Sequence, residues 1–363
     1  MCGRFFGIGL LNGGECMEYR DWMQDMGFSE QEKRAYEEAV DTALQSLVSG
    51  VSADPETDLG YLRECREYYM ETNLGRDLVP VCDALMHLLT PAAEDEALRV
   101  PQSDIKTMRE LYHAALVERR KEQWKTGLGK TEILAKQAVQ MEKTLNADRE
   151  DRYFDFQEVI HEFLFRDRYE PDFNLRRTPL PFFSYIDLHV GFLLKNERYD
   201  EVGFWIGEAE KLDPVTYRIP QRRAEIAEGR KDAQALQSAG KEICTRAVNR
   251  SEMARGLKTL ACSAGMLGDR VLETACLVHA GRFEPLRTAE TDKLQQLISL
   301  PECEGLLKTD RYEAILAKAG IPLSLEADVV RVSRNIAYAF ERMDCKELAE
   351  LFAHYTASAT EKD

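Results

Sequence analysis

Apolar residues recur at helical spacing along almost the whole chain, and strict alternation of apolar and polar residues is nearly absent. The first clear helix follows Ser29, which together with Glu32 has the pattern of a capping box. Its apolar face should continue until Gly50. That face comprises Tyr36, Ala39, Val40, Ala43, Leu44, Leu47 and Val48. The pattern predicts an all-α protein without a substantial sheet.

The same spacing predicts further helices at 57–72, 78–90, 103–124, 130–146 and 150–168. The segment from Arg168 to Phe183 contains Pro171, Pro179 and Pro181, so it cannot form a regular helix. We place the main boundary of the chain there. Helices then resume in pairs over 182–281, and a last pair is expected at 324–342 and 344–357.

The stretch from Phe183 to Thr216 has the pattern of two helices joined by a tight turn at Asn196 to Arg198. It resembles a tetratricopeptide repeat, because the positions that the family marks fall on suitable residues. These are Tyr199 after the turn, Val202, Ile206 and Ala209 in the second helix, and Pro214 at its end. His189 and Val190 depart from the family pattern, which prefers Leu and a small residue there.

Two weaker copies follow, over Tyr217 to Arg250 and around Leu267 to Asp269. The resemblance implies antiparallel helix pairs stacked as a TPR-like α-solenoid, with the first helix of each pair lining a groove. The groove positions of the family fall on Asp187, Lys195, Gln221, Glu225 and Glu228. A groove of mixed to acidic charge is therefore expected. If the register is right, Ala209 lies at a helix contact, and loss of the neighbouring Glu210 should have little effect.

The chain is accordingly expected to have four regions. Residues 1–16 are a poorly patterned N-terminal segment, and 17–170 are an N-terminal helical region. Residues 171–283 are the TPR-like repeats, and 284–363 are C-terminal helices that complete or cap the array. Met17 is an alternative start of the protein.

The composition of the chain limits the kinds of partner that it is expected to bind. The net charge of -16 argues against nucleic acid or an anionic membrane as the main partner, since both require a basic surface. No apolar run approaches the roughly 20 residues of a membrane helix. The nine cysteines show no C-x-x-C pair, which is typical of reduced thiols in a cytoplasmic protein. The groove favours a protein or peptide partner of basic or mixed charge.

One segment resembles the end of a phosphate-binding loop, Gly127-Leu128-Gly129-Lys130-Thr131. Trp124 stands where that motif needs its first glycine, and no buried strand precedes it, so we interpret the segment as a turn between helices. The basic run from Arg119 to Lys125 is interpreted as a solvated helix end, although with Trp124 it could bind an acidic partner.

Two Glu-x-x-His pairs, Glu110 with His113 and Glu158 with His161, have a spacing found in di-iron carboxylate bundles. Helical projection places both glutamates away from the apolar face and both histidines at its rim. We therefore expect no metal site, no cofactor and no catalytic motif. The favoured function is a non-catalytic scaffold or adaptor. The alternatives are a metal-binding or enzymatic protein with its site in the N-terminal region, and a ligand-responsive sensor.

Overall fold

The computed structural model describes residues 29–52, 54–72, 74–89, 102–147, 150–169, 171 and 173–360. Helices account for 77% of the described residues, so the prediction of an all-α protein is confirmed. Among the described helices, none is long and apolar enough to cross a lipid bilayer. The predicted segment 1–16 lies outside the described residues.

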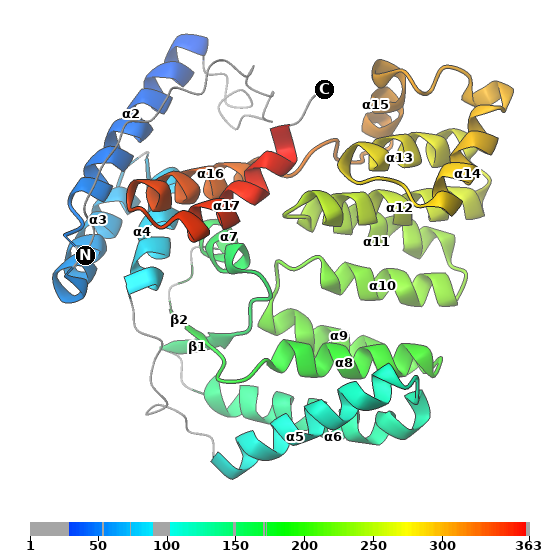
Figure 1. Cartoon of the computed structure of the whole chain (residues 1–363), viewed down its shortest axis with the longest axis horizontal. Coiled ribbons are helices and arrows are strands. Elements are labelled where there is room, and N and C mark those ends of the chain that lie inside the picture. The colour runs from blue at the N-terminus through cyan, green and yellow to red at the C-terminus, as the bar shows by residue number, and fades with distance from the viewer. Residues whose placement is uncertain are drawn as a thin grey trace.

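The middle of the chain is a stack of consecutive helices that lie side by side (Figure 1). We call α5, α6 and α8 to α15 the helix stack. Its helices are α5 (Gln102–Arg120), α6 (Trp124–Leu145), α8 (Phe182–Lys195), α9 (Tyr199–Leu212), α10 (Arg218–Gly229), α11 (Ala233–Arg246), α12 (Arg250–Leu267), α13 (Arg270–Phe283), α14 (Thr288–Ile298) and α15 (Thr309–Lys318). The turn predicted at Asn196 to Arg198 is confirmed, because it separates α8 from α9.

The stack is held by apolar contacts between successive helices. One core joins α5, α6, α8 and α9, a small one joins α10 and α11, and a third joins α12, α13 and α15. Ala209 is 2% exposed in the first of these cores. Gly240 of α11 lies so close to Leu260 of α12 that an added Cβ would come within 2.8 Å of it. Small residues therefore set how closely these helices approach.

Helices from both ends of the described chain form a second body, which we call the terminal bundle (Figure 1). Its helices are α2 (Glu30–Ser49), α3 (Pro55–Met70), α4 (Gly75–Leu89), α7 (Val159–Tyr169), α16 (Ala327–Arg342) and α17 (Lys346–Thr360). Leu44, Leu85, Phe163, Ile336 and Phe352 share its core. Nothing in the periodicity of the sequence indicated this contact between segments so far apart.

Local signals determine where several helices begin and end. The Ser29 hydroxyl accepts a hydrogen bond from the Glu32 N–H, and the Glu32 carboxylate accepts one from the Ser29 N–H, so the predicted capping box is confirmed. The side chains of Asn249 and Asp269 cap the starts of α12 and α13 by accepting hydrogen bonds from the N–H groups of Glu252 and Leu272. Gly268 ends α12 with a φ of 76°, a conformation that glycine adopts without strain.

The chain between α6 and α8 departs from the prediction. Instead of one helix over 150–168, residues Asp151–Phe154 form strand β1, which pairs in parallel with β2 (Asn174–Arg177), and α7 begins only at Val159. The Tyr153 N–H donates to the side chain of Asn146, so the backbone of β1 has bonding partners outside a helix. The crossover between the two strands takes α7 out of the helix stack and into the terminal bundle.

Candidate peptide-binding groove

A groove of about 510 Å³ is lined mainly by residues of α5, α8 and α10. Of the five residues predicted to bind a partner, Asp187, Lys195, Glu225 and Glu228 line it, so the structure brings these four together. Gln221 is not part of the lining, and its side-chain amide donates to Glu225 at 3.1 Å. The groove thus draws on the first helix of three successive pairs.

The floor of the groove is aromatic and apolar. Trp124, the first residue of α6, meets Phe192 of α8 edge-on, with ring centroids 5.2 Å apart. Phe192 and Leu188 are buried in a small cluster beneath the groove. Tyr112 and Tyr199 complete the aromatic lining. Such a floor can bury apolar side chains of a ligand, which is favourable by about 25 cal/mol per Å².

The resemblance of Gly127–Thr131 to a phosphate-binding loop has a packing explanation. The segment lies inside α6, so neither a loop nor the turn that we predicted is formed there. A Cβ at Gly127 would come within 2.3 Å of the Phe192 ring, so the glycine allows α6 to lie against α8. The side chain of Lys130 is paired with Glu118 at 2.5 Å. The segment therefore supports the groove and does not hold a phosphate.

Arg222 binds two of the acidic residues in the groove. Its Nε and Nη2 donate to the two carboxylate oxygens of Asp187 at 2.7 and 2.8 Å, and its Nη1 donates to Glu225 at 2.7 Å. Burial disfavours the charged guanidinium, but these hydrogen bonds and charges outweigh that effect and raise the pKa of Arg222 above its ordinary value. Arg222 therefore binds both carboxylates and compensates one of their two negative charges within the protein.

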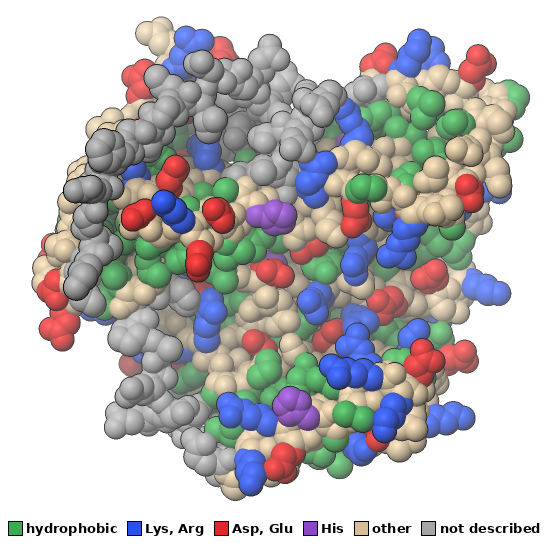
Figure 2. All heavy atoms as spheres, in the orientation of Figure 1, with side chains coloured by type: hydrophobic (Ala, Val, Ile, Leu, Met, Phe, Trp, Pro, Cys, Tyr) green, Lys and Arg blue, Asp and Glu red, His purple; other side chains and the backbone are tan. Residues whose placement is uncertain are grey.

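The charge that remains available in the groove is mainly basic. Arg119, Lys195 and Arg218 make no ion pair within the described part of the chain, and Lys195 lies 5.9 Å above the Trp124 ring. Glu228 is the groove carboxylate without an ion pair among the described residues. Figure 2 shows basic side chains over α5 and α8 on the face toward the viewer, with acidic ones among them. The mixed to acidic groove that we expected is thus more basic than its predicted residues suggested.

Sequence reasoning missed the contribution of α5 and the start of α6, namely Tyr112, Arg119 and Trp124. These residues precede the segment that resembles repeats, so the register of the repeats could not locate them. The available signal was the basic run around Trp124, which we interpreted as a solvated helix end, with binding of an acidic partner as the alternative.

The two Glu-x-x-His pairs do not form a common site. Glu110 is exposed, 4.0 Å from Lys106, and His113 is exposed as well. Glu158 precedes α7, and His161 is completely buried. The rim position predicted for His161 is wrong, because the terminal bundle and the helix stack enclose α7 from both sides. Within the described ranges, no group of three or more His, Cys, Asp or Glu residues could hold a metal ion.

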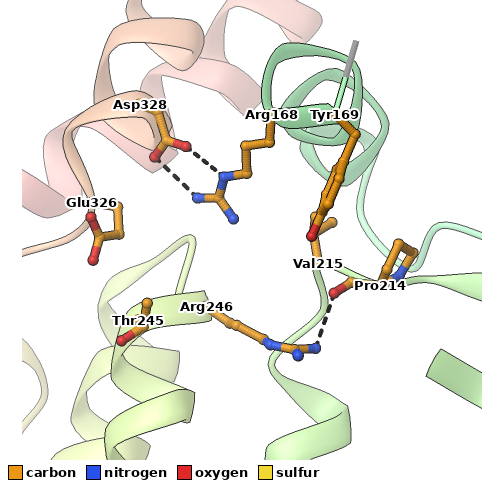
Figure 3. Close-up of a pocket in the computed structure, with 8 residues that line it drawn as sticks. All are labelled: Arg168, Tyr169, Pro214, Val215, Thr245, Arg246, Glu326 and Asp328. Carbon is orange, nitrogen blue, oxygen red and sulfur yellow. Dashed lines mark hydrogen bonds and ion pairs between the residues drawn. The ribbon is translucent and has the colours of Figure 1, made fainter. Parts of the chain in front are cut away.

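A second hollow, of about 320 Å³, lies where the helix stack meets the terminal bundle (Figure 3). Arg168 of α7 donates from Nη2 to Asp328 at 3.0 Å, and the second bond of this bidentate pair comes from Nε at 2.5 Å. Arg246 points away from this pair and donates to the carbonyl oxygen of Pro214 at 3.0 Å. Both guanidinium groups form hydrogen bonds within the protein. This hollow therefore has fewer cationic groups available to bind a ligand than the groove has.

No protein-family model matches this chain, and no curated protein does. Its function therefore has to be inferred from the groove itself.

Proposed function

We propose that this chain is a non-catalytic binding protein that takes an extended segment of another protein into the groove formed by α5, α8 and α10. The pairs α5–α6, α8–α9, α10–α11 and α12–α13 would then act as a TPR-like α-solenoid whose first helices face the ligand. The observation that carries the proposal is one groove lined from three successive first helices. Its volume of about 510 Å³ lies within the range of ligand sites.

The chemistry of the groove favours a segment that carries acidic side chains beside aromatic or aliphatic ones. Arg119, Lys195 and Arg218 offer cations without an ion-pair partner among the described residues, whereas Arg222 is occupied by two carboxylates. A segment of mixed charge could also use Glu228. A purely basic segment, which the sequence favoured alongside one of mixed charge, would meet three cations without an ion pair among the described residues and is disfavoured.

Two fluorescein-labelled octapeptides test this proposal, one alternating Glu with Leu and the other alternating Lys with Leu. Fluorescence anisotropy at low and high salt measures their affinities for the full chain. We expect the acidic peptide to bind, with an affinity that falls as salt rises, because charges at the rim of the groove steer association. Quenching of Trp124 should accompany binding, since this ring lines the groove.

The charge reversals Lys195→Glu and Arg218→Glu, combined, should weaken binding of the acidic peptide by on the order of tenfold or more. The matched control combines Lys143→Glu and Lys318→Glu, two exposed lysines outside the groove lining. This control changes the net charge equally and should bind almost as well as the wild type. Equal weakening in both double variants, or tighter binding of the basic peptide, would overturn the proposal.

We also propose that the protein acts in the cytoplasm. Cys65, Cys82, Cys244, Cys262, Cys276 and Cys303 in the described part of the chain are free thiols. Free thiols agree with a reducing compartment.

A further inference from the structure

Helix α7 joins the helix stack to the terminal bundle. Ile160, Phe163 and Leu164 are buried in the core of the terminal bundle. His161, on the same helix, contacts Asp213, the residue that ends α9 in the helix stack. One contact between the two bodies therefore passes through the buried side of α7.

His161 and Asp213 form a pair without solvent exposure. His161 Nδ1 lies 2.7 Å from Asp213 Oδ2, which also accepts a hydrogen bond from the Gln157 N–H at 2.8 Å. His161 Nε2 and Asp213 Oδ1 have no hydrogen-bond partner in the described part of the chain. A change of charge in such an enclosed pair is costly, because water cannot compensate it.

Other titratable groups from three further elements surround this pair. Glu252, near the start of α12, is 5% exposed, and its carboxylate acts on His161 through space. Tyr355 of α17 donates to the Glu158 carboxylate at 3.3 Å. Tyr217, just before α10, is acted on by the charges of the Glu252 and Glu158 carboxylates. Asp155 lies beside Asp213, and Arg177, Arg218 and Arg255 are at the periphery of the cluster.

Burial and neighbouring charges determine which of these groups hold protons. Burial alone would lower the pKa of His161, but the charge of Asp213 and the bond to it outweigh burial and raise the pKa above its usual 6.5. Burial raises the pKa of Glu252 to about 7. As pH rises, His161 loses a positive charge beside Asp213 and Glu252 gains a negative charge, so the net charge of the buried site becomes more negative. The closed arrangement is therefore most stable below neutral pH and becomes less stable as pH rises.

We propose that His161, Asp213 and Glu252 form a proton-dependent latch between the helix stack and the terminal bundle, closed while the cluster holds its protons and loosened when it loses them. A loosened latch would also alter the groove, and this last step rests on the function proposed above. Asp213 and the groove residue Arg218 stand at the two ends of one short linker between α9 and α10.

Nuclear magnetic resonance of the full chain with labelled histidine tests the protonation directly. The chain has six histidines, and His161→Gln identifies the resonance of His161. We expect the His161 ring to stay doubly protonated above pH 6.5. In Asp213→Asn, the midpoint of the titration of His161 should move below that value. Asp213→Asn preserves the shape of the side chain and gives the assignment if His161→Gln does not fold. A wild-type ring that titrates at or below 6.5 would overturn the latch.

Hydrogen exchange tests the loosening itself. Protection of the amides over 155–161 and 213–217 is compared at about pH 6 and about pH 8, after correction for intrinsic exchange. We expect at least roughly tenfold lower protection at the higher pH in the wild type, the effect of about one pKa unit, and a smaller difference in Glu252→Gln, which keeps only the proton of His161. The control is His279→Gln in α13, which removes a buried imidazole bonded to the Leu323 carbonyl and should retain the wild-type difference. Equal protection at both pH values in the wild type would contradict the proposal.

Binding of the acidic octapeptide at the same two pH values tests the link to the groove. We expect weaker binding at the higher pH in the wild type and a smaller pH dependence in Glu252→Gln. Binding by the wild type that does not depend on pH would overturn the link between latch and groove. If the peptide binds at neither pH, the proposed function of the groove is wrong, whereas resonance and exchange still decide the latch.

Discussion

Arg222 of α10 donates two hydrogen bonds to the two carboxylate oxygens of Asp187 of α8, at 2.7 and 2.8 Å. This bidentate pair links two successive helix pairs within the groove lining. The Arg222 side chain is only 22% exposed. Its removal would leave Asp187 and Glu225 partly buried without their cation, which is the costly way to break an ion pair.

We predict that Arg222→Ala lowers the free energy of unfolding by about 1 to 3 kcal/mol in urea titrations, since partial exposure screens part of the loss. The control Arg223→Ala removes an arginine that is 41% exposed and pairs with Glu210 and Glu242, so it should cost about 1 kcal/mol or less. Combining Arg222→Ala with Asp187→Ala should cost less than the sum of the single variants. Fully additive costs would show that the pair contributes nothing.

Two glycines of α6 should respond in opposite directions to the same substitution. Gly127→Ala places a Cβ within 2.3 Å of the buried Phe192 ring, and we expect a loss of about 1 to 3 kcal/mol through overpacking. Gly129→Ala meets nothing within 4 Å and should stabilise the helix by up to about 1 kcal/mol. Thermal melts followed by circular dichroism measure both. A change in melting temperature of the same sign for both substitutions would contradict the close contact between α6 and α8.

Ala209→Glu should destabilise the chain by several kcal/mol, on the order of the cost of an unpaired buried charge, because Ala209 is 2% exposed. The expectation that Glu210→Ala has little effect is revised by the structure. The Glu210 carboxylate binds Arg223 at 2.6 Å and Arg246 at 2.9 Å, joining α9 to α10 and α11. We now expect Glu210→Ala to cost about 1 kcal/mol in urea titrations, since these pairs are partly exposed. A cost near zero would restore the original expectation.

The buried ring of His189 should contribute a loss of stability in acid. This ring is 2% exposed, and burial lowers its pKa to about 4. Between the ordinary pKa of 6.5 and about 4, the unfolded state binds more protons than the folded state, so stability falls as pH falls. The loss amounts to at most about 3 kcal/mol.

Urea titrations at neutral pH and at about pH 4 should show that acid changes the stability of His189→Gln less unfavourably than that of the wild type. The exposed His113 provides the control, and His113→Gln should keep the wild-type slope. If the free energy of unfolding of both variants depends on pH as in the wild type, His189 does not lower the stability in acid.

Four residues of the groove lining were among the five predicted from sequence, because their positions depend on where a helix begins and which face it buries. Asp187 and Lys195 follow from the turn at Asn196, and Glu225 and Glu228 from the next helix. The tertiary structure decided what these residues do. It paired Asp187 and Glu225 with Arg222 and added the cations and aromatic rings of α5 and α6.

The helices and several of their ends were determined by the sequence itself, because caps such as Ser29 and apolar faces such as that of α2 act over one or two turns. Only the tertiary structure placed α16 and α17 in one core with α2 to α4, and it buried His161 against Asp213. It also made Asp151–Phe154 a strand, through pairing with β2. These features depend on contacts between segments far apart in the chain, and helical periodicity shows which side of a helix is buried but not what covers it.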